Sequence, residues 1–92
     1  MTPESELKRD IKRLLEARGA FWSMVTGGPY SKPGDPDIIA CYKGRYIGIE
    51  AKSAHGVQRP EQIIRQKQIE AAGGIYILAY SVKAVEDCLD SI

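Results

Sequence analysis

The chain has 92 residues, of which 43% are hydrophobic and 27% are charged, a composition typical of a single globular domain. A formal net charge of +1 argues against a dedicated basic nucleic-acid module, and no apolar run approaches the roughly 18 residues that cross a membrane. Two cysteines without metal-ligand spacing and an amino terminus unlike a signal peptide predict a reduced, cytoplasmic protein.

Charge is unevenly distributed along the chain. Three acids lie close together near the carboxyl end, so the first 82 residues hold 12 basic against 9 acidic side chains. A chain of this length buries only roughly 60–65% of its unfolded surface, which makes stabilisation by self-association plausible.

A helix is predicted at the amino end, with Thr2 as its cap, Pro3 in its first turn and Gly19 at its end. Its apolar stripe is formed by Leu7, Ile11, Leu14 and Leu15. Glu6 lies at the edge of this stripe. The polar side includes Lys8 and Lys12, which suits either a solvated face or a strip that meets phosphates.

A short strand over 20–26 and an irregular segment over 27–36, rich in Gly and Pro, are expected next. The irregular segment leads directly into Asp37. Tyr30 and Lys32 within it either contact a substrate or belong to a turn.

Two strands joined by a turn at Lys43-Gly44 are predicted within the stretch Gly34–Lys52. A two-residue turn would place Asp37 directly opposite Glu50, with Lys52 on the same face. A three-residue turn with a glycine bulge would shift the pairing by one and leave the carboxylates diagonal.

The rest of the chain predicts a loop over 53–59, a helix over 60–72 ended by two glycines, a strand over 75–80 and a helix over 82–89. The 75–80 strand is hydrophobic on both faces, so we expect it inside the sheet. Gln62 and Gln66 share a helix face that can point toward Asp37 and Glu50. The order α-β-β-β-α-β-α predicts an α/β domain with a mixed sheet flanked by helices.

An Asp, a Glu and a Lys on one sheet face suit a hard divalent ion such as Mg²⁺, with the ammonium group near a phosphate under attack. Phosphodiester hydrolysis is the natural chemistry for this set. The chain has no phosphate-binding Gly-rich loop, nucleophile elbow or zinc cluster, so we expect no organic cofactor.

The string GDPDII, GRYIGIEAK, RPEQ and AAGG, with twelve residues between Asp37 and Glu50, resembles the VRR-NUC family, the virus-type replication-repair nucleases of the PD-(D/E)XK superfamily. The resemblance runs from Glu6 to about Tyr80. It implies a single nuclease domain over 1–92 with a restriction-endonuclease-like core, of the minimal type that phages encode.

The resemblance also implies roles for individual residues. Asp37, Glu50 and the backbone carbonyl of Ala51 would hold Mg²⁺ or Mn²⁺, and Lys52 would assist the attacking water. Glu6 matches the acid on the family's first helix, a ligand directly or through water. Gln62 matches the glutamine of the following helix, with Gln66 as a substitute.

The leading interpretation is a homodimeric, metal-dependent DNA endonuclease that acts on branched DNA such as four-way junctions. Alternatives are a flap or other repair nuclease, a DNA-binding protein without catalysis, and a structural role in which Asp37 pairs with Lys52. Candidate DNA contacts are Lys8, Lys12, Tyr30, Lys32, His55, Arg59, Arg65 and Gln66. His55, the single histidine, can also be merely exposed.

Overall fold

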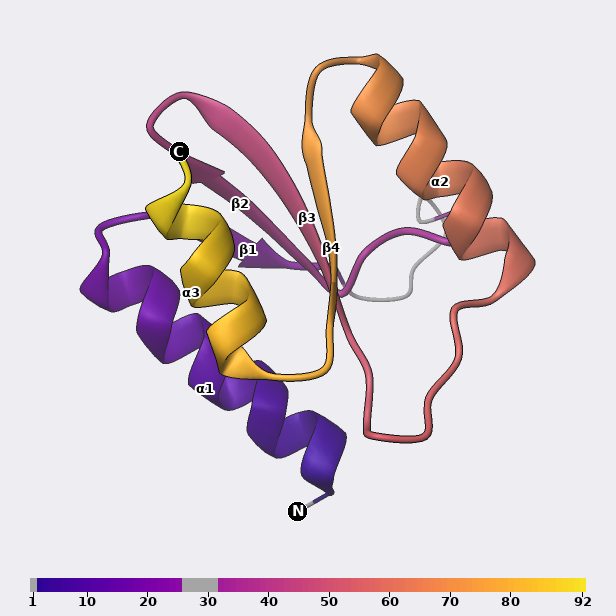
Figure 1. Ribbon diagram of the computed structural model, residues 1–92, viewed down its shortest axis with the longest axis horizontal. Helices are drawn as coiled ribbons and strands as arrows, with labels where there is room; N and C mark the ends of the chain where they lie inside the picture. The colour runs from indigo at the N-terminus through magenta and orange to yellow at the C-terminus, as the bar shows by residue number, and fades with distance from the viewer. Residues whose placement is uncertain (1, 26–31) are drawn as a thin grey trace.

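The computed structural model describes residues 2–25 and 32–92, so Tyr30 lies outside the described residues. The elements follow one another in the predicted order (Figure 1). They are α1 (Pro3–Ala17), β1 (Phe21–Met24), β2 (Ile38–Tyr42), β3 (Arg45–Ala51), α2 (Pro60–Ala71), β4 (Ile75–Ala79) and α3 (Val82–Asp90).

The first helix begins and ends where the sequence predicts. The Thr2 side chain accepts a hydrogen bond from the backbone N–H of Ser5, and Pro3 occupies the first turn. Gly19 follows the helix with a φ of 72°, a left-handed conformation in which a glycine costs least.

A two-residue turn joins β2 to β3. Lys43 and Gly44 have φ angles of 51° and 78°, as a type I′ turn requires, and Tyr42 pairs with Arg45. The predicted register is therefore confirmed, and the alternative with a glycine bulge is wrong.

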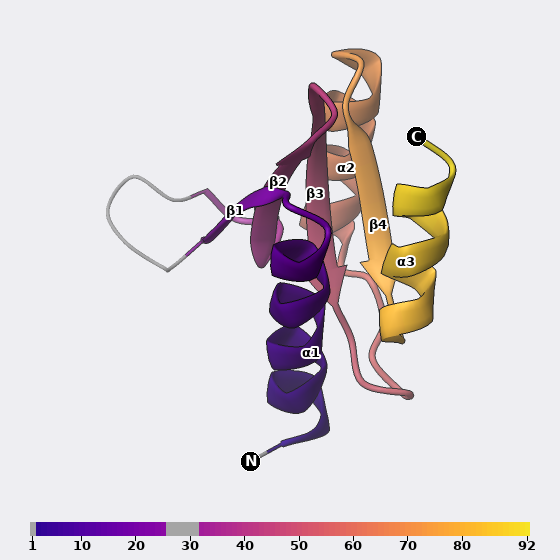
Figure 2. The same ribbon diagram turned by 90° about the vertical axis from the view of Figure 1, so that its left-hand side faces the viewer.

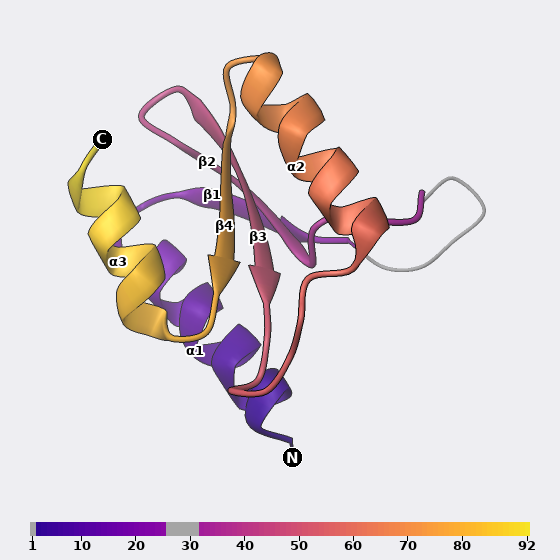
Figure 3. The same ribbon diagram turned by 45° about the vertical axis from the view of Figure 1, so that its right-hand side comes forward.

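The four strands form one mixed sheet in the order β1-β2-β3-β4. β1 pairs with β2 and β2 with β3 in antiparallel fashion, and β4 runs parallel to β3 after the crossover through α2. Figures 2 and 3 show α1 and α3 on one face of the sheet and α2 on the other. The protein thus has three layers, with α2 alone on the second face.

The hydrophobic core lies between the sheet and the pair α1 and α3. Helix side chains such as Ile11 and Leu89 pack there against the strand residues Ile38, Ile47 and Ile49. Because side chains alternate along a strand, the neighbours of these isoleucines point toward the α2 layer. Glu50 is one of them.

The predicted position of the last strand is wrong. β4 lies at an edge of the four-stranded sheet, beside β3 only. Its two hydrophobic faces have another cause, because α3 packs on one face of β4 and α2 on the other. The hydrophobic residues on both faces of β4 therefore indicate a helix on each face, and not a neighbouring strand on each side.

Within the described residues, no helix is both long enough and apolar enough to cross a membrane.

Candidate active site

Asp37 and Glu50 face each other across the β2–β3 hairpin. Ile38 pairs with Ile49, so the next position places Asp37 opposite Glu50. The backbone N–H of Ala51 donates to Oδ2 of Asp37 at 3.0 Å, which holds the Asp37 carboxylate against the end of β3. Both carboxylates therefore lie on the α2 face of the sheet.

Glu50 is the buried member of this pair, with 4% of its surface exposed. Burial, followed by the charge and hydrogen bonding of Asp37, raises the pKa of Glu50 from 4.5 to about 7, against the opposing effect of Lys52 and Lys8. Its Oε1 atom is buried without a hydrogen-bond partner among the described residues. Such an oxygen is costly unless a donor or a cation reaches it.

Two ammonium groups lie beside the carboxylates. Nζ of Lys52 is 3.9 Å from Oε2 of Glu50, on the face that strand alternation predicts. Nζ of Lys8, which extends from α1, is 3.6 Å from Oδ1 of Asp37. Lys8 was expected to contact DNA, and the structure places it directly on a proposed metal ligand.

The segment before Asp37 is fixed against the first turn of α2. Gly34 has a φ of 90°, and a Cβ atom there would lie 2.2 Å from the backbone oxygen of Glu61. Only glycine permits this approach. Asp35 adds an ion pair with Arg65 of α2, at 3.0 Å between Oδ1 and Nε.

Pro36 then covers the middle of β3. A Cβ atom at Gly48 would lie 2.8 Å from Cγ of Pro36 and 3.3 Å from Cδ1 of Ile69 in α2. The bare backbone at Gly48 therefore leaves room for the proline ring. Each residue of the GDPD string thus has a physical part in bringing the Asp37 carboxylate to Glu50.

The two candidate glutamines lie one turn apart on α2, and Gln62 is the more deeply buried of the two. Gln62 is 2% exposed, and its Oε1 accepts a hydrogen bond from the backbone N–H of Arg59 at 2.8 Å. Gln66 accepts from Nε2 of Gln58 at 2.8 Å and donates to Glu70 at 3.3 Å. Gln62 secures the start of the helix, and its role at the site stays a prediction.

Glu6 is exposed in the first turn of α1. In the described part of the chain, no group of three or more His, Cys, Asp or Glu side chains is placed to hold a metal ion. The structure therefore does not gather Glu6 with Asp37 and Glu50, and its part as a ligand stays a prediction.

The remaining candidate DNA contacts occupy different surroundings. Lys12 lies over the Trp22 ring, 5.7 Å from its centroid, and Arg65 is bound to Asp35. Lys32, His55 and Arg59 are exposed, and Arg59 is 3.6 Å from Glu61.

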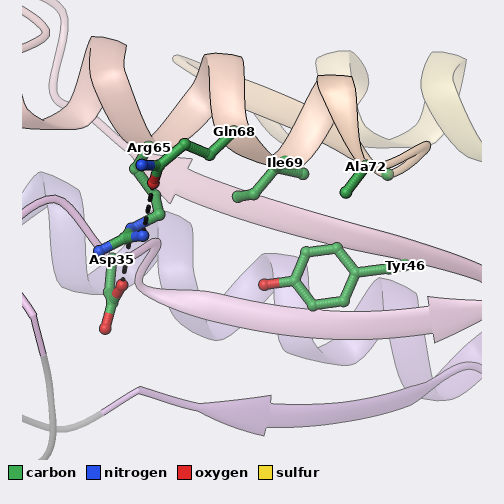
Figure 4. Close-up of a pocket in the computed structure, with 7 residues that line it drawn as sticks. Asp35, Tyr46, Arg65, Gln68, Ile69 and Ala72 are labelled. Atoms are coloured by element: carbon green, nitrogen blue, oxygen red, sulfur yellow. Dashed lines mark hydrogen bonds and ion pairs between the residues drawn. The ribbon is translucent and has the colours of Figure 1, made fainter.

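A pocket of about 410 Å³ lies on the same face of the sheet, toward the hairpin end of β3. Figure 4 shows Arg65 reaching down from α2 to Asp35, with the Tyr46 ring beneath the helix. Gly48, covered by Pro36, separates Tyr46 from Glu50 along β3. The pocket and the carboxylate pair are therefore distinct features.

Sequence reasoning missed one buried polar residue beside the carboxylates. Tyr76 of β4 is 7% exposed and pairs with Gly48 on the α2 face. It stands within a hydrophobic run and so resembles ordinary core. The one available signal was strand alternation, which places Tyr76 on the face opposite to Ile75 and Ile77.

The carboxylate pair fits a hard divalent ion. Mg²⁺ commonly takes one or two protein carboxylates and keeps several waters, so two opposed groups are sufficient. A bound cation would give the unpaired Oε1 of Glu50 a partner. It would also offset the repulsion between the two carboxylates that helps to raise the pKa of Glu50.

No model of a known protein family matches the sequence, and no curated protein matches it either. Solved structures do match the fold. A structure described as a VRR_NUC domain superposes with a TM-score of 0.80 at 21% sequence identity, covering 98% of this chain and 97% of that one.

A second match is Hjc from Archaeoglobus fulgidus, a Holliday junction resolvase from an archaeal hyperthermophile. It superposes with a TM-score of 0.58 at 21% identity, over 78% of this chain and 63% of that chain. The predicted restriction-endonuclease-like architecture is confirmed, and the chain has the fold of the VRR_NUC domain.

Proposed function

We propose that this protein is a divalent-metal-dependent DNA endonuclease. The observation that carries the proposal is the convergence of Asp37, Glu50 and Lys52 on one sheet face, with a buried carboxylate oxygen that lacks a partner among the described residues. The fold shared with a VRR_NUC domain and a Holliday junction resolvase supports the same assignment.

Asp37, Glu50 and the backbone carbonyl of Ala51 would hold Mg²⁺ or Mn²⁺. When bound, the ion supplies an acidified water and stabilises negative charge on the phosphate. Lys52 contributes a compact positive charge that orients the attacking water or the phosphate. The amide of Ala51 keeps Asp37 aimed at Glu50, so the ligands are set before the ion arrives.

The proposed substrate is branched DNA, and the proposed assembly is a homodimer. The similar structure from Archaeoglobus fulgidus is a Holliday junction resolvase, which favours a four-way junction over a linear duplex. Lys8 and Lys12 on α1, with the exposed Lys32, His55 and Arg59, are proposed to meet the DNA backbone.

The deciding experiment incubates the purified protein with labelled linear, flap and four-way-junction DNA, with and without Mg²⁺ or Mn²⁺. We expect metal-dependent cutting of the junction. Lys52→Ala and Asp37→Asn should each reduce the rate at least 100-fold, a typical loss for a group acting on the reacting phosphate.

Exposed residues of the same types provide matched controls. Lys43→Ala in the hairpin turn and Asp87→Asn in α3 should leave cutting unchanged. Absence of metal-dependent cutting on every substrate would end the enzyme assignment, and junction binding without cutting would favour a DNA-binding protein. Cutting of flaps alone would correct the substrate.

A further inference from the structure

The Tyr76 hydroxyl is a buried hydrogen-bond donor that has no role in the proposed hydrolysis as described above. The side chain is 7% exposed, and its hydroxyl has no hydrogen-bond partner among the described residues. Buried polar atoms in folded proteins nearly always have a partner, so such a hydroxyl calls for an explanation.

A complementary unpaired atom lies on the same face of the sheet. Oε1 of Glu50 is an acceptor, and it too is buried without a partner in the described chain. Tyr76 pairs with Gly48, two residues before Glu50 on the adjacent parallel strand. Strand spacing then separates the two Cα atoms by roughly 8 Å, a distance that two long side chains can bridge.

Electrostatics place the hydroxyl in the field of the carboxylates. Burial is the main cause of the raised pKa of Tyr76. The nearby Gln58 side chain lowers this pKa, although it does not reach hydrogen-bond geometry with the hydroxyl, and the charges of Glu50 and Asp37 raise it. Gln58 is itself held, because its Nε2 donates to Oε1 of Gln66 at 2.8 Å. The hydroxyl therefore lies near both Gln58 and the carboxylate pair.

We propose that Tyr76 is a positioning residue of the carboxylate site, whose hydroxyl donates a hydrogen bond to one buried water that in turn donates to Oε1 of Glu50. Lys52 lies beside Oε2, so the two side chains together fix both oxygens of Glu50. Tyr76 does not touch DNA in this role. The proposal rests on the metal-dependent nuclease function, for which a correctly aimed Glu50 is needed.

The first test uses metal-free protein at pH 9, where Glu50 is ionised. Tyr76→Phe removes only the hydroxyl, and we expect it to lower the melting temperature by at least about 5 °C, because a water-mediated hydrogen bond to a charged group is lost. In a Glu50→Met background the same change should have no effect or raise the melting temperature. Equal shifts in both backgrounds would reduce Tyr76 to ordinary packing and overturn the proposal.

The second test measures Mn²⁺ binding by calorimetry without DNA. Tyr76→Phe should weaken binding about tenfold, as is typical when a group supporting a metal ligand is lost. Tyr80→Phe is the matched control, since its hydroxyl donates to the Gly56 carbonyl at 3.0 Å near the surface. A folded Tyr76→Phe protein that binds Mn²⁺ within twofold of the parent would contradict the proposal.

The two tests separate this inference from the proposed function. If the parent protein binds no Mn²⁺ and cuts no DNA, the nuclease assignment fails, while the metal-free comparison with and without Glu50 still decides whether Tyr76 is linked to that carboxylate through the water.

Discussion

Ionisation of the buried Glu50 side chain is opposed by burial and by the neighbouring charge of Asp37. A carboxyl whose pKa is higher in the folded protein than in the unfolded chain binds its proton more tightly when folded. The metal-free protein should therefore lose stability as pH rises from about 4.5 to about 7. Burial is the main cause of the upper limit of this range, Asp37 raises it further, and Lys52 and Lys8 lower it.

Glu50→Gln removes this titration, and we expect it to stabilise the metal-free protein at pH 8 by on the order of 2–3 kcal/mol. At pH 4 the variant and the parent should be nearly equal, because both side chains are then neutral. Urea unfolding at several pH values measures the difference. A constant difference across the range would mean that Glu50 titrates normally.

Bound metal should act on the stability of the parent protein in the opposite direction to a rise in pH. Added Mg²⁺ should restore stability above pH 7, because the ion favours the ionised carboxylates that repel one another without it. Glu50→Gln serves as the control, since its site has lost one anionic ligand and should respond weakly.

At the scale of elements, the β2–β3 hairpin was the most predictable part of the protein. The Lys43-Gly44 turn and the alternation of the two strands were sufficient to place Asp37 opposite Glu50. Local rules decide both features, so one sequence contains the necessary information.

Long-range packing was less predictable. Nothing local in the sequence shows that Gly34 meets the backbone of Glu61, or that Asp35 pairs with Arg65, because these partners belong to a helix that follows two strands later. The edge position of β4 was missed for the same reason, since a strand covered by helices on both faces has the same composition as an internal one. The sequence pattern reports burial but not the identity of the covering element.

The contact between Gly34 and α2 predicts a large effect of a small substitution. Gly34→Ala places a methyl group 2.2 Å from the Glu61 oxygen at a positive φ, so we expect a loss of at least about 3 kcal/mol in the free energy of unfolding. Displacement of Asp37 should follow and weaken Mn²⁺ binding in any folded fraction.

Gly73→Ala is the matched control for this substitution. Gly73 has a φ of 93°, close to the 90° of Gly34, but a Cβ atom there meets nothing within 4 Å. Only backbone strain of about 1 kcal/mol is expected, measured by urea unfolding. Equal losses for the two variants would show that contact with α2 does not constrain the GDPD segment.

At the scale of the whole molecule, size limits what one copy can do. The principal extents are 33 × 30 × 23 Å, and 33 Å along a duplex corresponds to roughly ten base pairs at 3.4 Å per step. One copy carries one Asp37–Glu50 pair and can contact about one arm of a junction. The proposed symmetric cutting of a four-way junction would therefore use two copies, one for each cut.

A mixing experiment tests this arrangement. The parent protein, incubated with a plasmid that extrudes a cruciform, should linearise the plasmid in one encounter. When the parent is premixed with excess Lys52→Ala protein, most active copies are paired with an inactive one, so nicked circles should accumulate in place of linear product. If the copies act singly, the inactive protein would slow cutting by competition and leave the ratio of nicked to linear product unchanged. Sedimentation at the working concentration provides the control, because a purely monomeric protein would remove the dimer from the proposal while leaving the metal site intact.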